Sequence, residues 1–221
     1  MKKTIILLFT GLLSFGVSAQ SFGLKGGINM ANAGGDDADI LGYTEPGLPA
    51  TSVAPSMFIG PMFGAFMQFG DGAIRYTVEA TYTQKGAEYE GSLTSADATY
   101  YYLGSQLEAK LSAGFIDLGI MGNFHVTDEF SINAGPYLGI RTNYKEEVKI
   151  TWQGQTILDI NSSDDDGLEQ TEFGGNIGFS YWINDMLLLD ARYCMGFTSM
   201  SDDADVFTRN MQVGVSYLFS Y

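Results

Sequence analysis

The C-terminal stretch Arg209–Tyr221 alternates between apolar and polar side chains. One face carries apolar and aromatic residues from Met211 to Tyr221, and the other is mostly small and polar, with Gln212 and Gly214 among its members. Successive side chains of an extended backbone point to opposite sides, so a period of two residues predicts a β-strand. Its length, its terminal aromatic residue and its small polar face are typical of a strand between lipid and a polar lumen.

The same alternation recurs in seven earlier segments. It is clearest in the third, where Ile74, Tyr76 and Val78 share one face. The second segment is apolar on both faces, and only the assignment of Gln68 to the polar side fixes its orientation. The seven segments predicted as strands are Ser21–Ala31, Met57–Phe69, Ile74–Lys85, Gly114–Val126, Phe130–Arg141, Thr171–Ile183 and Met186–Thr198.

The connections between these segments alternate between long and short. Long connections fall at residues 32–56, 86–112, 142–170 and 199–208, of which 86–112 is mixed in character and the others are polar. Short turns, including Asp71-Gly72, separate them, and we expect strand extensions around 99–103 within the 86–112 connection. This rhythm places all long loops at one rim. We therefore predict an all-β fold, an eight-stranded antiparallel up-and-down transmembrane β-barrel. Proline cannot donate to a strand ladder, so we expect a bulge at Pro61 and another at Pro136.

The N-terminus has the features of a secretory signal peptide. Lys2 and Lys3 precede the apolar run Ile5–Gly16, and Val17-Ser18-Ala19 resembles a cleavage site. We expect a signal peptide over residues 1–19 and a mature barrel domain over 20–221. Since no cysteine follows the cleavage site, a lipid anchor is not expected. These features predict export to a bacterial outer membrane.

Charge and composition exclude several classes of protein. The chain has 26 acidic against 11 basic residues and a net charge of −15, which removal of Lys2 and Lys3 makes more negative. Such a chain is not expected to bind nucleic acid, which requires a basic surface. Cys194 is the only cysteine, which excludes an internal disulfide. Beyond the signal peptide, no apolar run is long enough for a membrane-spanning helix.

Four segments carry a resemblance to a known family. These are Phe22–Asn32, Glu79–Gly86, Asn133–Gly139 and Asp190–Gly196. In this order they resemble PorT-like outer-membrane β-barrel proteins of the Bacteroidota, over nearly the whole mature chain. The resemblance implies the same fold and location. It implies little about activity, because one member is needed for secretion of surface proteins and most have no assigned activity.

The predicted inward positions collect charges of both signs. Arginine or lysine facing lipid costs roughly 2–4 kcal/mol at the membrane midplane, so a shared inward side is consistent with the predicted orientation. An eight-stranded barrel has an interior just wide enough for side chains, so we expect these charges to pair across a filled lumen. A proton or substrate path is the alternative. The predicted network consists of Lys25, Arg75, Glu79, Asp117, Arg141, Glu172, Asp190 and Arg192.

Acidic residues gather in three of the long connections. One interpretation is a solvated, mutually repelling rim. The other is a shared Ca²⁺ or Mg²⁺ site, because hard cations bind carboxylate oxygens, although the spacing is not that of an EF-hand. The candidate ligands are Asp36, Asp37, Asp39, Asp164, Asp165, Asp166, Asp202, Asp203 and Asp205.

No arrangement of residues in the sequence indicates catalysis. His125 is the only histidine, and neither it nor Cys194 has a recognisable catalytic partner. We expect a non-enzymatic protein without a cofactor, which serves membrane architecture, surface interaction or secretion. Its expected partners are outer-membrane lipid, the barrel-insertion machinery and another envelope or surface protein.

Two alternatives to a non-enzymatic membrane barrel remain. One is a membrane-embedded enzyme that acts at the loop rim. The other is a small-ligand-binding barrel of lipocalin type, which requires an apolar interior and is disfavoured by inward Arg75 and Glu79.

Overall fold

The computed structural model describes residues 21–35, 38, 55–92, 105–163, 168–200 and 205–220. The predicted signal peptide and the first mature residue, Gln20, lie outside these ranges. Within them, no helix has the length and apolar character needed to cross a membrane.

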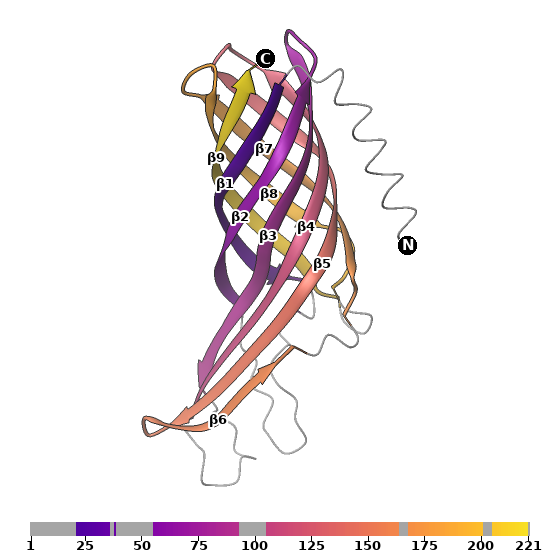
Figure 1. Ribbon diagram of the computed structural model, residues 1–221. Helices are drawn as coiled ribbons and strands as arrows, with labels where there is room; N and C mark the ends of the chain where they lie inside the picture. The colour runs from indigo at the N-terminus through magenta and orange to yellow at the C-terminus, as the bar shows by residue number, and fades with distance from the viewer. Residues whose placement is uncertain are drawn as a thin grey trace.

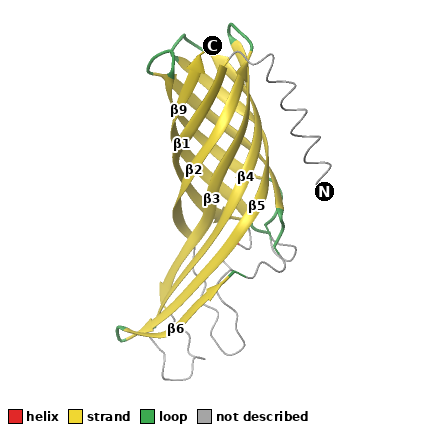
Figure 2. Ribbon diagram, viewed as in Figure 1, coloured by secondary structure: helices red, strands yellow, loops and turns green. Residues whose placement is uncertain are grey.

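The described residues form nine antiparallel strands (Figures 1 and 2). They are β1 (Ser21–Gly34), β2 (Pro55–Phe69), β3 (Ile74–Ser92), β4 (Gln106–His125), β5 (Phe130–Trp152), β6 (Gln155–Ser162), β7 (Thr171–Trp182), β8 (Leu187–Gly196) and β9 (Phe207–Ser220). The sheet order is β4-β3-β2-β1-β9-β8-β7-β5-β6, and an additional β4–β5 pairing closes a ring that leaves out only β6. The predicted all-β, eight-stranded up-and-down barrel is confirmed. The ninth strand, β6, was not predicted.

The two ends of the barrel differ in their connections. Short turns join β2 to β3, β4 to β5 and β7 to β8, and Ser21 pairs with Ser220 at the same end. We call this end the turn rim. The ends of β1, β3 and β8 and the starts of β2, β4 and β9, together with β6, lie toward the opposite end, which we call the loop rim (Figure 1).

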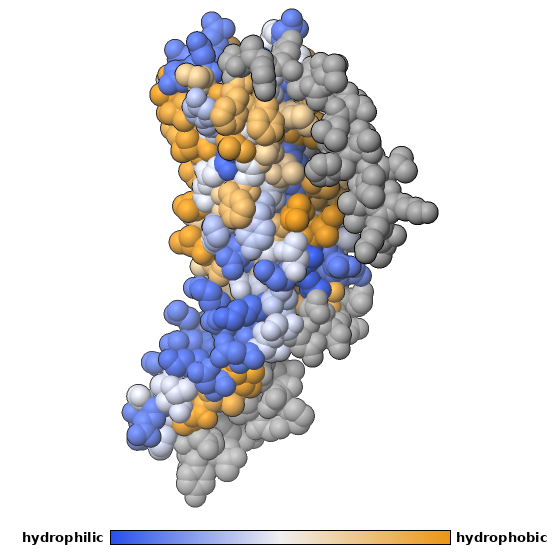
Figure 3. Space-filling model, in the orientation of Figure 1, coloured by the Kyte–Doolittle hydropathy of each residue, from blue (hydrophilic) through white to orange (hydrophobic). Residues whose placement is uncertain are grey.

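Large apolar side chains cover the outside of the barrel. Ile59, Ile120 and Ile177 are 62%, 58% and 59% exposed. Water-soluble globular proteins bury most of their isoleucine side chains. Figure 3 shows apolar side chains gathered over the barrel and hydrophilic ones over the segment beyond it. In β2 the apolar residues split between the faces, with Ile59 outward and Phe66 buried inside, which confirms the parity set by Gln68.

Strands β3, β4 and β5 continue beyond the barrel at the loop rim. Their continuations, residues 86–92, 106–113 and 143–152, pair with one another, and β6 adds to β5. We call this four-stranded unit the protruding sheet. The interpretation of 142–170 as a polar loop is therefore wrong over 143–152 and 155–162. Residues 99–103, where strand extensions were expected, lie outside the described residues.

A β-bulge in β5 marks the start of the protruding sheet. Phe115 pairs with Arg141 and Gly114 with Asn143, so Thr142 is the extra residue. The Thr142 hydroxyl donates to the Gly114 carbonyl at 3.0 Å, and the Gly114 N–H donates to Asn143 Oδ1 at 2.7 Å. The inward positions change from odd to even numbers at this point. A strict period of two residues therefore ends at Arg141 although the strand does not.

The two strand prolines behave differently. The β2–β3 register shifts between Met57 and Met62, which confirms the irregularity predicted at Pro61. At Pro136 the prediction of a bulge is wrong, because the β5–β7 register runs through it unchanged. On the β4 side the pairing is interrupted between Ala134 and Tyr137 and resumes in the same register. The missing N–H is therefore accommodated by a gap in one ladder.

Candidate functional site: the layered lumen and the protruding sheet

The lumen is closed near the turn rim by an apolar plug. Phe66, Leu188 and Leu218 are buried there, from β2, β8 and β9, and Trp182 packs against them. These positions belong to the inward series of their strands, which is otherwise polar. The plug therefore places an apolar layer at one end of the lumen.

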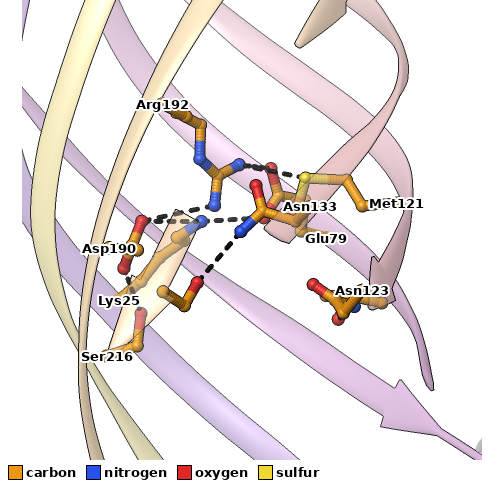
Figure 4. A network of polar contacts seen from close by, with 10 residues as sticks. Lys25, Glu79, Met121, Asn123, Asn133, Asp190, Arg192 and Ser216 are labelled. Carbon is orange, nitrogen blue, oxygen red and sulfur yellow. Dashed lines mark hydrogen bonds and ion pairs between the residues drawn. The ribbon is translucent and has the colours of Figure 1, made fainter. Parts of the chain in front are cut away.

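A first ion cluster lies next to this plug. Lys25 Nζ is 2.7 Å from Glu79 Oε2 and 3.9 Å from Asp190 Oδ1, and Arg192 bridges the same carboxylates at 2.6 Å and 3.3 Å. The Ser216 hydroxyl donates to Asp190 at 2.9 Å (Figure 4). Two cations and two anions alternate, and each side chain is at most 7% exposed.

A second ion cluster lies nearer the loop rim. Lys85 Nζ donates to Asp117 Oδ1 at 3.0 Å and to Glu172 Oε1 at 2.8 Å, and its side chain is 1% exposed. The hydroxyls of Tyr137 and Thr208 donate to Glu172 at 2.5 Å and 2.7 Å. The ammonium also lies 4.5 Å from the centroid of the Phe115 ring, within cation–π range. Lys85 therefore binds both carboxylates, and two hydroxyl groups also donate to that of Glu172.

The structure places the predicted inward charges in four surroundings. Lys25, Glu79, Asp190 and Arg192 form the first ion cluster, and Asp117 and Glu172 belong to the second. Arg75 lines the mouth of the barrel at the turn rim. Arg141 is buried near the loop rim and donates to the Leu168 carbonyl at 3.0 Å.

Sequence reasoning missed Lys85 and the role of Tyr137. The signal for Lys85 was present, because it continues the odd-numbered inward series of Arg75, Glu79 and Thr83 on the same strand. The period of two residues places Tyr137 inward, but its partner could not be predicted. The Tyr137 ring packs over Gly174, the residue opposite it on β7, where any side chain would occupy the space of the ring.

The remaining candidate residues show no metal or catalytic arrangement among those the structure describes. Asp205 is exposed, and the other eight aspartates proposed as cation ligands lie outside the described ranges. No group of three or more described His, Cys, Asp or Glu residues is arranged to hold a metal ion. Cys194 is a free, buried thiol in the lumen. His125 lies at the turn rim with its ring centroid 6.5 Å from that of Trp182.

The protruding sheet has one apolar and one charged face. Tyr89, Leu107, Val148 and Ile150 form a buried cluster on the inner face, and Leu158 and Ile160 of β6 pack against it. On the outer face Lys110 Nζ is 2.9 Å from Glu88 Oε1, and the pairs Lys110–Glu147 and Lys149–Asp159 stand directly opposite each other. The sheet is therefore a folded element with its own small core.

Partial burial perturbs two side chains on the inner face. It raises the pKa of the Glu146 carboxyl above its usual range. Burial, followed by the charge of Glu146, raises the pKa of the Tyr144 hydroxyl to about 12.

The β5–β6 hairpin leaves one sheet edge open. Gln153 and Gly154 both have positive φ, 50° and 79°, which is the signature of a type I′ turn. Along β6 the backbone pairs with β5 on one side, and its other side has no strand partner within the described part of the chain. Such an edge presents free N–H and C=O groups to another strand.

A closed ring of strands, an apolar exterior and a charged interior define an integral outer-membrane β-barrel. A family model described as outer membrane protein beta-barrel domain matches residues 18–202. The chain belongs to this family, and its location is the bacterial outer membrane. No curated protein sequence matches it.

Several solved structures are similar to the chain in fold. One is Ail, the attachment invasion locus protein of Yersinia pestis, whose structure was solved in complex with the heparin analogue sucrose octasulfate. Ail is 14% identical to this chain with a TM-score of 0.49, and the match covers 90% of this chain and 99% of the Ail chain. Neisserial surface protein A is 14% identical with a TM-score of 0.41, and the match covers 90% of this chain and 97% of that protein. The outer membrane protease OmpT of Escherichia coli is 7% identical with a TM-score of 0.45, and the match covers 91% of this chain and 98% of OmpT.

Proposed function

We propose that this protein is a non-enzymatic membrane anchor that presents the protruding sheet for docking to another envelope or surface protein. The observation that carries the proposal is the open edge of β6, on a sheet built from the same strands that form the barrel wall. Because β3, β4 and β5 run from the barrel into the sheet without a break, the edge is held at a fixed place relative to the membrane.

The filled lumen favours anchoring over transport. The apolar plug and both ion clusters occupy successive layers of the interior, and their charges are bound to one another. Between the plug and the first ion cluster there is a cavity of about 30 Å³, which has room for ordered water but not for a solute path. Ions crossing the barrel would have to separate buried salt bridges.

The chemistry of β6 defines the expected occupant, an extended segment of a partner protein. Its backbone would pair with β6, as in β-strand addition. Alternate apolar residues would extend the inner face beyond Leu158 and Ile160, and a basic residue would face Asp159. The resemblance to PorT-like proteins, one of which serves secretion, agrees with a partner among surface proteins.

Further parts of the proposal concern orientation and surroundings. In barrels of this kind short turns are periplasmic and longer loops extracellular, so the loop rim with its acidic connections would face the outside. The export signal and the barrel-insertion machinery would deliver the chain, and lipid would surround the exposed apolar belt.

Photo-crosslinking in intact cells tests the docking edge. A photoreactive residue at Asn161 of β6 is expected to give a discrete protein adduct, while the same residue at Phe179, on the apolar exterior, gives none. Proline is then placed at Asp159 and Ile160 in separate variants. Neighbouring N–H groups of a strand point to opposite sides, so one of the two prolines removes an N–H from the open edge and the other removes one from the β5–β6 ladder. Hydrogen exchange of the β5 and β6 amides shows which variant keeps the ladder, and that one is the edge-blocked variant.

That edge-blocked variant should lose the adduct. An adduct that persists in it, or none from Asn161 in the unmodified chain, would contradict docking at β6.

A further inference from the structure

An apolar pocket lies at the loop rim, where the barrel meets the base of the protruding sheet. Its volume is about 90 Å³. Its lining includes Lys85 and Thr208, which belong to the second ion cluster, and Ala87, Leu111 and Tyr144, which belong to the protruding sheet. The pocket therefore spans the junction between the two parts of the molecule.

Hydrogen bonds fix the part of the wall that lies outside these strands. The Met200 N–H donates to the Val206 carbonyl at 2.8 Å, and the Met200 carbonyl accepts from the Glu169 N–H at 3.0 Å. The Arg141 side chain donates to the Leu168 carbonyl at 3.0 Å. Leu168, Met200 and Val206 all line the pocket, so it is preformed, as small-molecule sites usually are. Leu168 and Met200 are only half-buried, which places the pocket close to the surface.

The polar side chains of the lining are largely engaged within the protein. Lys85 and Thr208 are bound to carboxylates of the second ion cluster. Asn32 Oδ1 accepts from the Ala33 N–H at 2.9 Å. A buried water needs about two to four polar partners, and cavities without them stay dry. The pocket therefore favours an apolar occupant over water.

We propose that this pocket binds a small uncharged apolar molecule of about the size of benzene. An apolar cavity of about 150 Å³ is known to stay dry and to bind benzene, and this pocket is of the same order. An ion would find the charges of the lining already paired, and a whole lipid acyl chain exceeds the volume. Because the ion clusters fill the lumen beneath, the ligand is held at the rim and is not passed through the barrel. The proposal does not depend on docking at β6.

Methionine methyl groups provide the test. Met200 lines the pocket, whereas Met195 and Met211 are 40% and 49% exposed on the apolar exterior. The protein is labelled with ¹³C-methyl methionine, placed in lipid nanodiscs and titrated with benzene and, separately, with palmitate. Benzene that dissolves in lipid shifts the Met195 and Met211 signals in proportion to its concentration. Benzene in the pocket should shift the Met200 signal saturably, and palmitate should not.

Two substitutions change the size of the pocket. Ala87→Leu fills it and should weaken the apparent affinity for benzene by on the order of tenfold or more. Ala80→Leu is the matched control, because it makes the same change on the same strand at an exposed position and should leave the affinity unchanged. Leu111→Ala enlarges the pocket, so it should keep benzene binding and add saturable binding of butylbenzene.

Three results would overturn the proposal. They are a Met200 shift that stays proportional to benzene concentration, a saturable shift with palmitate equal to that with benzene, and an affinity for benzene unchanged in Ala87→Leu. If Ala87→Leu does not fold, Leu111→Ala decides, and a failure of that variant to bind butylbenzene would contradict the assignment of the pocket.

Discussion

Within the described ranges, Lys85 is the cation paired with Asp117 and Glu172 in the interior, so its removal should be costly. Lys85→Met leaves two buried carboxylates without their cation, and we expect a loss of about 3–5 kcal/mol in unfolding free energy. Lys149→Met, on the exposed face of the protruding sheet, is the control and should change it by less than about 0.5 kcal/mol. Urea titrations in micelles measure both. The triple variant with Asp117→Asn and Glu172→Gln should recover much of the loss, and equal stability of Lys85→Met and the unmodified chain would refute the role of this cation.

The packing of Tyr137 on Gly174 gives a second residue-scale prediction. A Cβ at Gly174 would lie 2.5 Å from two ring atoms of Tyr137 and 2.5 Å from the Met195 carbonyl oxygen. Because the Tyr137 hydroxyl is bound to Glu172, the ring cannot move away freely. Gly174→Ala should therefore destabilise the barrel by about 1–3 kcal/mol. Gly122→Ala, where the nearest atom is 4.0 Å away, should be tolerated. The midpoints of urea unfolding compare the two, and equal midpoints would contradict the packing.

For single residues, the sequence predicts which side chains face the lumen better than it predicts which side chains pair with each other. Which residues face inward followed from period two, and exposure confirms it for Lys25, Glu79 and Asp190. Which cation meets which carboxylate depends on strand stagger, and Lys25 and Asp190 lie far apart in the sequence. Arg75 illustrates the limit, because inward orientation at the end of a strand places a side chain at the mouth and not in a network.

The β5–β6 hairpin carries predictions at the scale of an element. Its two turn residues have positive φ, and asparagine adopts this conformation more readily than glutamine. Gln153→Asn should slow hydrogen exchange of the paired amides in β6, and Gly154→Ala should accelerate it, each by an amount that reflects roughly 0.5–1 kcal/mol. Changes of the same sign in both variants would argue against a type I′ turn.

The raised pKa of Glu146 makes the protruding sheet sensitive to pH. Folding favours the protonated carboxyl, so stability is greatest below the ordinary glutamate pKa and falls as pH rises through the raised value. Glu146→Gln should therefore protect the amides of Val148 and Ile150 from exchange at pH 7, and the difference should vanish in acid. Glu147→Gln is the control, since that exposed side chain pairs with Lys145, and it should give no such protection. If Glu146→Gln protected these amides equally at every pH, the assignment would be contradicted.

Element boundaries show why part of the fold escaped prediction from sequence. Strand β5 continues past Arg141, but the bulge at Thr142 changes which parity faces inward, and the alternation is lost at that residue. In β6 the residues Asp159 and Asn161 alternate with Leu158 and Ile160, a signal too short beside charged neighbours to separate a strand from a loop. The apolar plug was missed for a related reason, because Phe66 and Leu188 break the rule that inward positions are polar.

At the scale of the whole molecule, the lumen of the barrel is filled by successive layers of side chains. An apolar plug, two ion clusters and a sheet with its own core follow one another from the turn rim to the loop rim. The eight strands of the barrel ring and their up-and-down order were predictable because loop lengths alternate along the chain. The content of each layer was not, because it combines residues from strands that are distant in sequence.

The most direct test of this account is electrical recording from the purified, refolded protein in a planar lipid bilayer at physiological salt. A lumen sealed by the plug and by paired charges predicts a silent baseline, with no steady conductance across applied voltages of either sign. A stable open level, reproducible from one insertion to the next, would show a continuous aqueous path and contradict the account.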